Sequence, residues 1–106
     1  MSSSVKVIKP ATVRLWARKH PTAAPSLSGW LALVKAAKFK DFVALRRVYR
    51  SADLVRVASG RNVVVFNISG NNYRLIAAVH FNTQRVFALR FMTHAEYSKD
   101  QWKETL

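Results

Sequence analysis

Three side chains that can transfer protons stand within four positions near the C-terminus. They are His94, Glu96 and Tyr97, in the stretch FMTHAEY at residues 91–97. An imidazole, a carboxylate and a phenol can each give or take a proton while a bond is cleaved. The chain has only three His and five Asp or Glu in 106 residues, so the cluster stands out. It is either a proton-transfer site or the polar end of an apolar strand.

The net charge indicates the ligand class. Lys and Arg number 18 against five acids, which gives a net charge of +13. Residues 1–40 hold eight Lys or Arg and residues 54–95 hold five Arg, with no acid in either segment. A domain this basic is expected to bind a polyanion. Because the charge is spread along the chain and not gathered on one amphipathic helix, nucleic acid is favoured over a membrane surface.

Composition sets further limits. Residues 1–106 have the length of a single domain, and 50% hydrophobic residues suffice for a core. The absence of Cys excludes disulfides and thiolate metal sites. No apolar run approaches the ~20 residues of a membrane span. The N-terminal stretch MSSSVKVIKP lacks the apolar centre of a signal peptide, which predicts a cytoplasmic protein.

The first half of the chain predicts one short strand followed by helices. VKVI at 5–8 alternates apolar and polar residues, as a strand does. Residues 10–20 and 26–39 have helical spacing, and Ser26 or Ser28 is a candidate N-cap of the second helix. The short connection between the helices predicts an antiparallel pair. Residues 41–49 predict a further helical turn.

The second half predicts a β meander. The segments RNVVVFNI, NNYRLIAAVHF and QRVFALRFM are rich in Val, Ile, Phe and Tyr, and tight-turn residues separate them. Residues 94–106 predict a short C-terminal helix. The fold class is therefore α+β: two N-terminal helices pack on one face of an antiparallel sheet of three to four strands. At least part of the other face is expected to be open to a ligand.

Strand alternation and turn positions predict which side chains meet. In the middle strand, Tyr73, Leu75, Ala77 and Val79 should face the helices, which leaves Arg74 on the other face. The turn after Ile68 should place Asn67 opposite Arg74. The next turn should place Arg74 opposite a residue between Phe91 and Thr93. Asn67 and Arg74 therefore converge on His94 and Tyr97, whereas Arg61 begins its strand at the far end.

This convergence suits RNA cleavage without a metal. Metal-assisted cleavage usually needs two or more carboxylates, and the cluster offers only Glu96, with Asp100 beyond it. No Gly-rich phosphate loop or nucleophile elbow is present. RNA supplies its own nucleophile, the 2′-OH, so the protein has only to move protons and stabilise the phosphate. No metal or cofactor is expected.

Each residue of the cluster then has an expected role. Arg74 binds the scissile phosphate, because its planar fork makes paired hydrogen bonds and stays charged. His94, Glu96 and Tyr97 can each serve in the proton transfers. The working hypothesis makes His94 the general acid and has Glu96 or Tyr97 activate the 2′-OH or orient His94. The expected RNA-binding residues are Arg61, Asn67, Asn71, Arg90 and Lys99.

Four segments carry a resemblance to a known family. They are KHP (19–21), YRSAD (49–53), VVFNISGNNYRLIAAV (64–79) and MTHAEYSK (92–99). The chain resembles the HigB toxins of bacterial toxin–antitoxin pairs, within the RelE/ParE-like superfamily. The blocks VFNI-x-GN-x-YRL and THAEY are specific when they occur together, and the resemblance covers most of the chain.

The resemblance implies a ribosome-dependent mRNA interferase that cuts the message in the A site, needs no metal and leaves a 2′,3′-cyclic phosphate or a 3′-phosphate. It implies a HigA-like helix-turn-helix antitoxin, through which alone the toxin would reach operator DNA. The positions that match the family are Arg74, His94, Glu96 and Tyr97, with Asn71 a plausible turn residue. Relatives commonly carry an Asp after this Tyr, where this chain has Ser98.

Two other functions fit the same sequence. In a non-catalytic nucleic-acid-binding module only the charge would matter, and changing His94 or Tyr97 would leave activity intact. In a ParE-type gyrase poison the fold would be shared without the nuclease site, and mRNA in arrested cells would stay intact.

Overall fold

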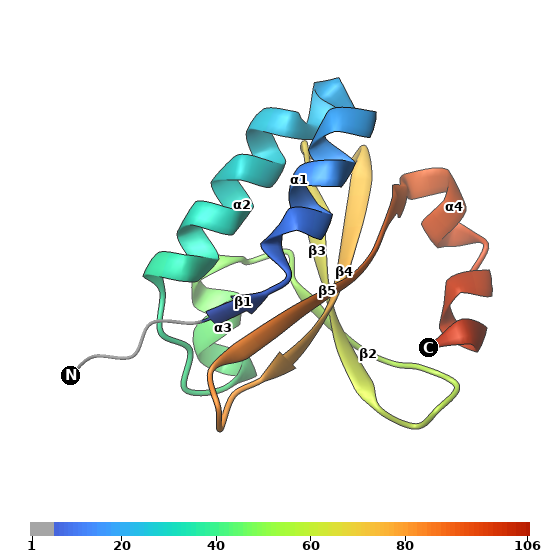
Figure 1. Cartoon of the computed structure of the whole chain (residues 1–106). Coiled ribbons are helices and arrows are strands. Elements are labelled where there is room, and N and C mark those ends of the chain that lie inside the picture. The colour runs from blue at the N-terminus through green and yellow to red at the C-terminus, as the bar shows by residue number, and fades with distance from the viewer. Residues whose placement is uncertain (1–5) are drawn as a thin grey trace.

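The computed structural model describes residues 6–106, so Val5, the first residue of the strand predicted at 5–8, lies outside the described part. The fold class is confirmed as α+β with a short C-terminal helix (Figure 1). The elements in chain order are β1 (Lys6–Ile8), α1 (Pro10–Lys19), the 3₁₀ turn η1 (Pro21–Ala23), α2 (Ala24–Ala36), α3 (Phe42–Val48), β2 (Asp53–Arg56), β3 (Asn62–Ile68), β4 (Tyr73–His80), β5 (Arg85–Thr93), α4 (His94–Ser98) and the 3₁₀ turn η2 (Gln101–Thr105).

The helices α1 and α2 lie side by side and antiparallel, as predicted (Figure 1). The predicted serine cap of α2 is wrong. The helix begins at Ala24 without a side-chain cap, and Pro25 occupies its first turn. The fixed φ of proline suits that position, where its missing N–H leaves no helical bond unmade. A side-chain cap appears instead at α3, where Asp41 Oδ1 accepts a hydrogen bond of 2.9 Å from Ala44 N.

The sheet has five strands in the order β1-β5-β4-β3-β2, not three to four. Strands β2 to β5 form the predicted antiparallel meander. The additional edge is parallel, because β1 lies alongside β5 with Val7 opposite Val86. A parallel pair needs a long crossover connection, and the segment containing α1, α2 and α3 is part of it. A three-residue strand gives no signal in the sequence for so distant a partner.

One face of the sheet is covered by the helices. Their buried side chains pack on the inward residues of β3 and β4, and this core contains Val13, Leu27, Trp30, Val34, Leu45, Val64, Phe66, Leu75 and Ala77. The predicted alternation along β4 is confirmed, since Tyr73 and Val79 also pack against this core.

The opposite face is only partly open. Buried Val63, Val65, Ile76 and Met92 form a second, smaller core with Trp102 of η2, which is 7% exposed. Asp100 adopts a left-handed conformation (φ 61°) between α4 and η2. That turn brings the chain back over the sheet, and α4 and η2 lie together on one side of it (Figure 1). In the described part of the chain, no helix is long and apolar enough to cross a bilayer.

Candidate active site

Arg74 is the buried polar side chain of the second face, with only 7% of it exposed. The predicted register is confirmed: Arg74 lies opposite Asn67 on β3 and opposite Met92 on β5. Its Nη1 donates hydrogen bonds to the carbonyl oxygens of Asn71 (3.2 Å) and Tyr73 (3.1 Å). Its Nη2 donates to the Asn71 side-chain oxygen. The β3–β4 turn therefore fixes the guanidinium in one orientation.

This guanidinium has no carboxylate partner among the described residues. The ion pair that the structure shows in residues 6–106 joins Lys103 to Asp100 at 3.2 Å. The Arg74 Cζ instead lies 5.5 Å from the centre of the Tyr97 ring, in a cation–π contact. Arginine has five N–H donors, and the hydrogen bonds to Asn71 and Tyr73 use three of them. A buried cation without a counter-ion and with two donors left over suits an incoming anion.

The same turn also anchors the start of α4. Asn72 accepts a hydrogen bond of 2.9 Å at its carbonyl oxygen from the His94 backbone N–H. Asn71 and Asn72, which are adjacent, therefore position Arg74 and the His94 backbone together.

Glu96 holds the first turn of α4. Its Oε1 accepts hydrogen bonds from the Thr93 backbone N–H and from the Thr93 hydroxyl, both at 3.1 Å. In return, Glu96 N donates to Thr93 Oγ1 at 3.2 Å. This is a complete capping box, in which the side chain of each residue accepts a hydrogen bond from the otherwise unpaired backbone N–H of the other. The carboxylate therefore has a structural role that explains its presence.

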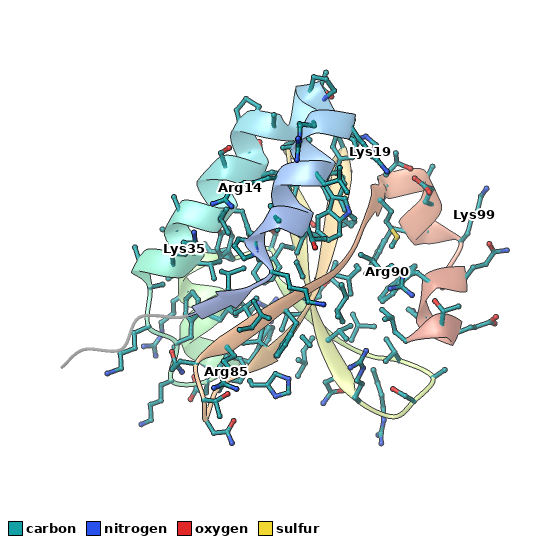
Figure 2. The ribbon with its side chains drawn as sticks, viewed as in Figure 1. Arg14, Lys19, Lys35, Arg85, Arg90 and Lys99 are labelled. Carbon is teal, nitrogen blue, oxygen red and sulfur yellow. The ribbon has the colours of Figure 1, made fainter. Side chains whose placement is uncertain are left out.

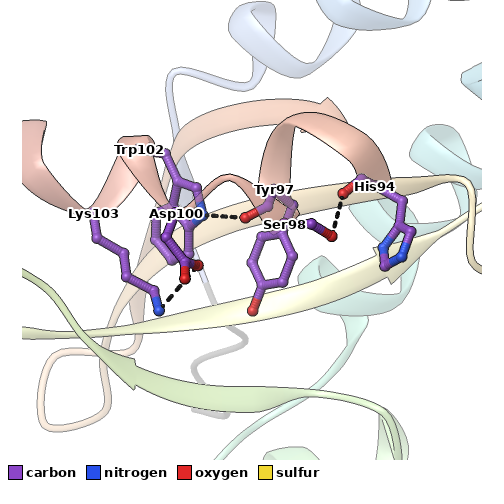
Figure 3. Close-up of polar contacts among 6 residues, drawn as sticks. All are labelled: His94, Tyr97, Ser98, Asp100, Trp102 and Lys103. Atoms are coloured by element: carbon purple, nitrogen blue, oxygen red, sulfur yellow. Dashed lines mark hydrogen bonds and ion pairs between the residues drawn. The ribbon is translucent and has the colours of Figure 1, made fainter.

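His94 and Tyr97 stand three residues apart on α4, a spacing that places side chains on one face of a helix. Figure 3 shows both rings projecting from the same side of α4. His94 is exposed, whereas Tyr97 is half-buried. The hydroxyl of Ser98, the last residue of α4, donates a hydrogen bond of 3.0 Å to the His94 carbonyl oxygen one turn earlier (Figure 3).

Tyr97 is held between a cation and a second aromatic ring. Its ring stacks on Trp102 with centroids 5.3 Å apart and planes inclined by 19°. The Trp102 indole N–H donates to the Tyr97 carbonyl oxygen at 3.1 Å (Figure 3). Lys103 Nζ lies 5.8 Å from the Trp102 ring centre. The contacts therefore run in the order Arg74, Tyr97, Trp102, Lys103, with a cation at each end and two aromatic rings between them.

The environment of Tyr97 keeps its phenol protonated. Burial is the main cause that raises the pKa of Tyr97 above its ordinary value, and the negative charge of Asp53 raises it further. Lys103 and Arg74 act in the opposite direction without reversing the shift. At neutral pH this side chain can therefore donate a hydrogen bond or a proton, and it is a poor base.

Two of the predicted RNA-binding residues meet in one cleft. Arg90 and Lys99, both labelled in Figure 2, line it together with Glu96, Gln101 and Trp102. Its volume is about 340 Å³. Arg90 lies on the same face of the sheet as Ile76, its partner on β4, and donates from Nη2 to Thr105 Oγ1 at 3.3 Å. The cleft shares Trp102 and Glu96 with the cluster around Tyr97.

The other predicted RNA-binding residues are placed differently. Asn67 lies opposite Arg74 and is half-buried. Asn71 uses its carbonyl and side-chain oxygens to hold Arg74, so its first role is positioning. Arg61 immediately precedes β3 and is exposed, about 20 Å along the strand from Asn67. The structure does not bring Arg61 to the cluster.

Two contributors to the site were not predicted. Trp102 supports the Tyr97 ring, and Asp53 on β2 raises its pKa. An isolated Trp after a run of polar residues was the available signal for Trp102. The acid of YRSAD was visible in the sequence, but its position beside Tyr97 depends on how β2 lies in the sheet.

Within residues 6–106, no three or more His, Asp or Glu side chains gather as metal ligands would.

Comparison with known proteins adds a family match. Residues 23–100 match the family of HigB toxins, described as the RelE-like toxic component of a toxin–antitoxin system. A curated relative from Escherichia coli O6:H1, named mRNA interferase HigB, is 29% identical over 93 residues, or 88% of each chain. The mRNA interferase toxin HigB of Escherichia coli K12 is 31% identical over 81 residues, or 76% of each chain. The mRNA interferase HigB of Shigella flexneri is similar to the same extent.

Proposed function

Because the chain belongs to the HigB family of toxins, the toxic components of toxin–antitoxin systems, we propose that it is an endoribonuclease that cuts mRNA on the ribosome. The names of the relatives, mRNA interferase HigB, support cleavage of mRNA. The observation that carries the proposal is Arg74, a buried arginine without a carboxylate partner among the described residues. It contacts Tyr97 and is held by the β3–β4 turn, which also anchors the backbone of His94.

The reaction needs only groups that the cluster and the RNA supply. The 2′-oxygen attacks the adjacent phosphorus and loses its proton, while the bond from phosphorus to the 5′-oxygen breaks and that oxygen gains a proton. The products are a 2′,3′-cyclic phosphate and a 5′-hydroxyl. Arg74 stabilises the charge that develops on the phosphate through its two remaining N–H donors, which the turn at Asn71 already orients.

Two proton transfers remain to be assigned. Tyr97 stays protonated at neutral pH, because burial raises its pKa, so we assign it the donation, toward the leaving 5′-oxygen or a phosphate oxygen. His94 then takes the proton of the 2′-OH, which reverses the role of general acid expected for it from the sequence. The carboxylate of Glu96 is engaged by the Thr93 cap, so we assign it the positioning of α4 and no proton transfer.

The cleft between β5 and η2 extends this site along the RNA. Arg90 and Lys99 supply cations to its lining, and contacts of this kind with phosphates weaken as salt rises. The substrate that we propose is mRNA in the ribosomal A site, so the toxin acts in the cytoplasm. Its partner is a HigA-like helix-turn-helix antitoxin, which also links the toxin to operator DNA.

The decisive experiment compares induced wild type with His94→Ala by primer extension on translated messages. New 5′ ends should appear in the wild type and be lost in His94→Ala, with Lys19→Ala, an exposed change on α1, as the matched control. An arrest of growth with intact messages would overturn the proposal and favour a gyrase poison.

The chemistry has a separate test. Ribosomes are programmed with a message that carries a single 2′-deoxy nucleotide at the cleavage site. This message should resist the toxin, because the nucleophile is missing. Cleavage of the deoxy message at the normal rate would contradict a 2′-OH mechanism, although the protein would still be a nuclease.

A further inference from the structure

The helix α3 presents an outward stripe that the candidate site does not use. Val43, Arg46 and Arg47 of α3 are exposed, and so is Arg50, which lies two residues past the end of the helix and continues the same sequence spacing. The opposite side of the segment, with Phe42, Leu45 and Tyr49, packs into the helix-side core. The stripe therefore does not serve the core of this molecule.

A groove lies along this stripe. Phe42, Val43, Arg46, Arg47 and Arg50 line it, and its volume of about 470 Å³ exceeds that of the cleft beside α4. Apolar surface is exposed here as well: Val43 is 61% exposed and Val48, at the end of the helix, is 46% exposed. Asp41, the acid that directly precedes the helix, uses its carboxylate to cap it. In the described part of the chain, no carboxylate pairs with the three arginines.

The mixture of apolar and cationic groups indicates the partner. Carboxylates pair well with arginine forks, and exposed valines need apolar side chains to cover them. RNA would use the cations, but no aromatic ring of this segment stands clear of the core for a base to stack on, because Phe42 packs against the core even where it lines the groove. Its two aromatic residues are engaged, since Phe42 and Tyr49 pack against the core and Tyr49 meets Phe66 at 5.1 Å. An acidic protein segment with apolar side chains fits better than a nucleic acid.

We infer that the α3 groove is the docking surface for an acidic, apolar-faced segment of the antitoxin. This takes from the proposed function only the existence of an antitoxin partner, and it does not depend on the cleavage chemistry. Residues of α3 belong to the helix-side core, whereas Tyr97 and Trp102 belong to the second core on the other face of the sheet. Figure 1 likewise shows α3 and α4 on different sides of the molecule. The segment docked at α3 therefore does not itself contact the cluster around Arg74.

The toxin is co-expressed with its antitoxin, separated from it by denaturation and then refolded. Its binding is measured by calorimetry, with the purified cognate antitoxin as the titrant. Two variants are compared with wild type: the triple change Arg46→Ala, Arg47→Ala and Arg50→Ala, and the single change Val43→Asp. The matched control removes the same charge from the exposed surface of α1 and α2, with Arg14→Ala, Arg18→Ala and Lys35→Ala; Arg14 and Lys35 are labelled in Figure 2.

Loss of several central contacts should weaken antitoxin binding about 100-fold in the α3 triple variant and about 10-fold in Val43→Asp. The control should stay within about threefold of wild type. Both α3 variants should unfold at the wild-type temperature and should be as toxic as wild type, yet the antitoxin should no longer rescue growth.

Equal antitoxin binding by the α3 triple variant and the control would overturn the inference. So would an α3 triple variant that keeps the antitoxin but loses ribosome binding, since the groove would then serve RNA. Neither result depends on whether the wild type cleaves mRNA, because the titration measures antitoxin binding alone.

Discussion

The carboxylate of Glu96 gives the sharpest test of which groups react and which only hold the site. Glutamine can replace glutamate in a capping box, because its side-chain oxygen also accepts from the N-cap residue. In Glu96→Gln the amide oxygen can accept from the same two donors, Thr93 N and Thr93 Oγ1, which lie 3.1 Å from Oε1. The variant therefore separates the cap from the charge.

The magnitudes follow from the bonds that each change removes. Thr93→Ala removes the acceptor of Glu96 N and the hydroxyl that Oε1 binds, which should cost about 1 kcal/mol of unfolding free energy. For a domain of this size the melting temperature should fall by about 4 °C. Glu96→Ala should lose a similar amount, whereas Glu96→Gln should lose only a few tenths of a kcal/mol.

Two measurements on the same proteins decide the matter. Thermal unfolding followed by circular dichroism reports the cap, and cleavage of messages on programmed ribosomes reports the chemistry. Glu96→Gln should keep cleavage within about threefold of wild type, because a lost proton-transfer group would cost about 100-fold or more. A Glu96→Gln protein with a normal melting temperature and cleavage reduced 100-fold would refute our assignment and make Glu96 a catalytic base or acid.

Of three further predictions, two concern groups around this helix and one concerns a tyrosine outside it. Arg74→Lys keeps the charge but loses most of the fork that binds Asn71. Cleavage should therefore fall about 100-fold in single-turnover assays, and the unfolding free energy should fall by about 2 kcal/mol in denaturant titrations. A fully active lysine variant would contradict the need for a fork. Trp102→Ala removes the ring that supports Tyr97, so cleavage should fall about as far as in Tyr97→Ala, and an unchanged rate would show that the stack is dispensable. Burial raises the pKa of Tyr49 to about 12, so the folded protein keeps this proton to a higher pH than the unfolded chain does. The stability that Tyr49 contributes is therefore complete below about pH 10 and is lost as the pH rises toward 12. Tyr49→Phe should lose less stability over that range in urea titrations, and identical losses would count against the shift.

Much of the fold could be read from local patterns. The alternation along residues 73–79 assigned the two faces of β4 correctly, because successive side chains of a strand must point in opposite directions. The short turn between β3 and β4 set the pairing of Arg74 with Asn67, since few residues separate the strands. The helix that begins at His94 was also visible as a change from strand to polar residues, although its exact bounds were not.

Other features had no local signal. The parallel pairing of β1 with β5 joins residues almost eighty positions apart, and a short strand is compatible with several partners. A β-bulge between Ile76 and Ala77 displaces the pairing along β5, which no turn length could indicate. The cover that Trp102 provides for the second face depends on the left-handed turn at Asp100, a conformation uncommon for residues other than glycine.

The sequence by itself determined the α+β class, the faces of the central strands, the positive charge and the candidate residues Arg74, His94 and Tyr97. These depend on side-chain type and on periodicities of two or about four residues, which the order of the residues displays directly. Only the tertiary structure decided what each residue touches. In the folded chain Glu96 caps α4, Asn71 accepts a hydrogen bond from Arg74, and Trp102 stacks on Tyr97. The Arg74 guanidinium has no carboxylate partner among the described residues. Such contacts depend on where separate segments come together in space, and that is decided by the packing of the whole chain.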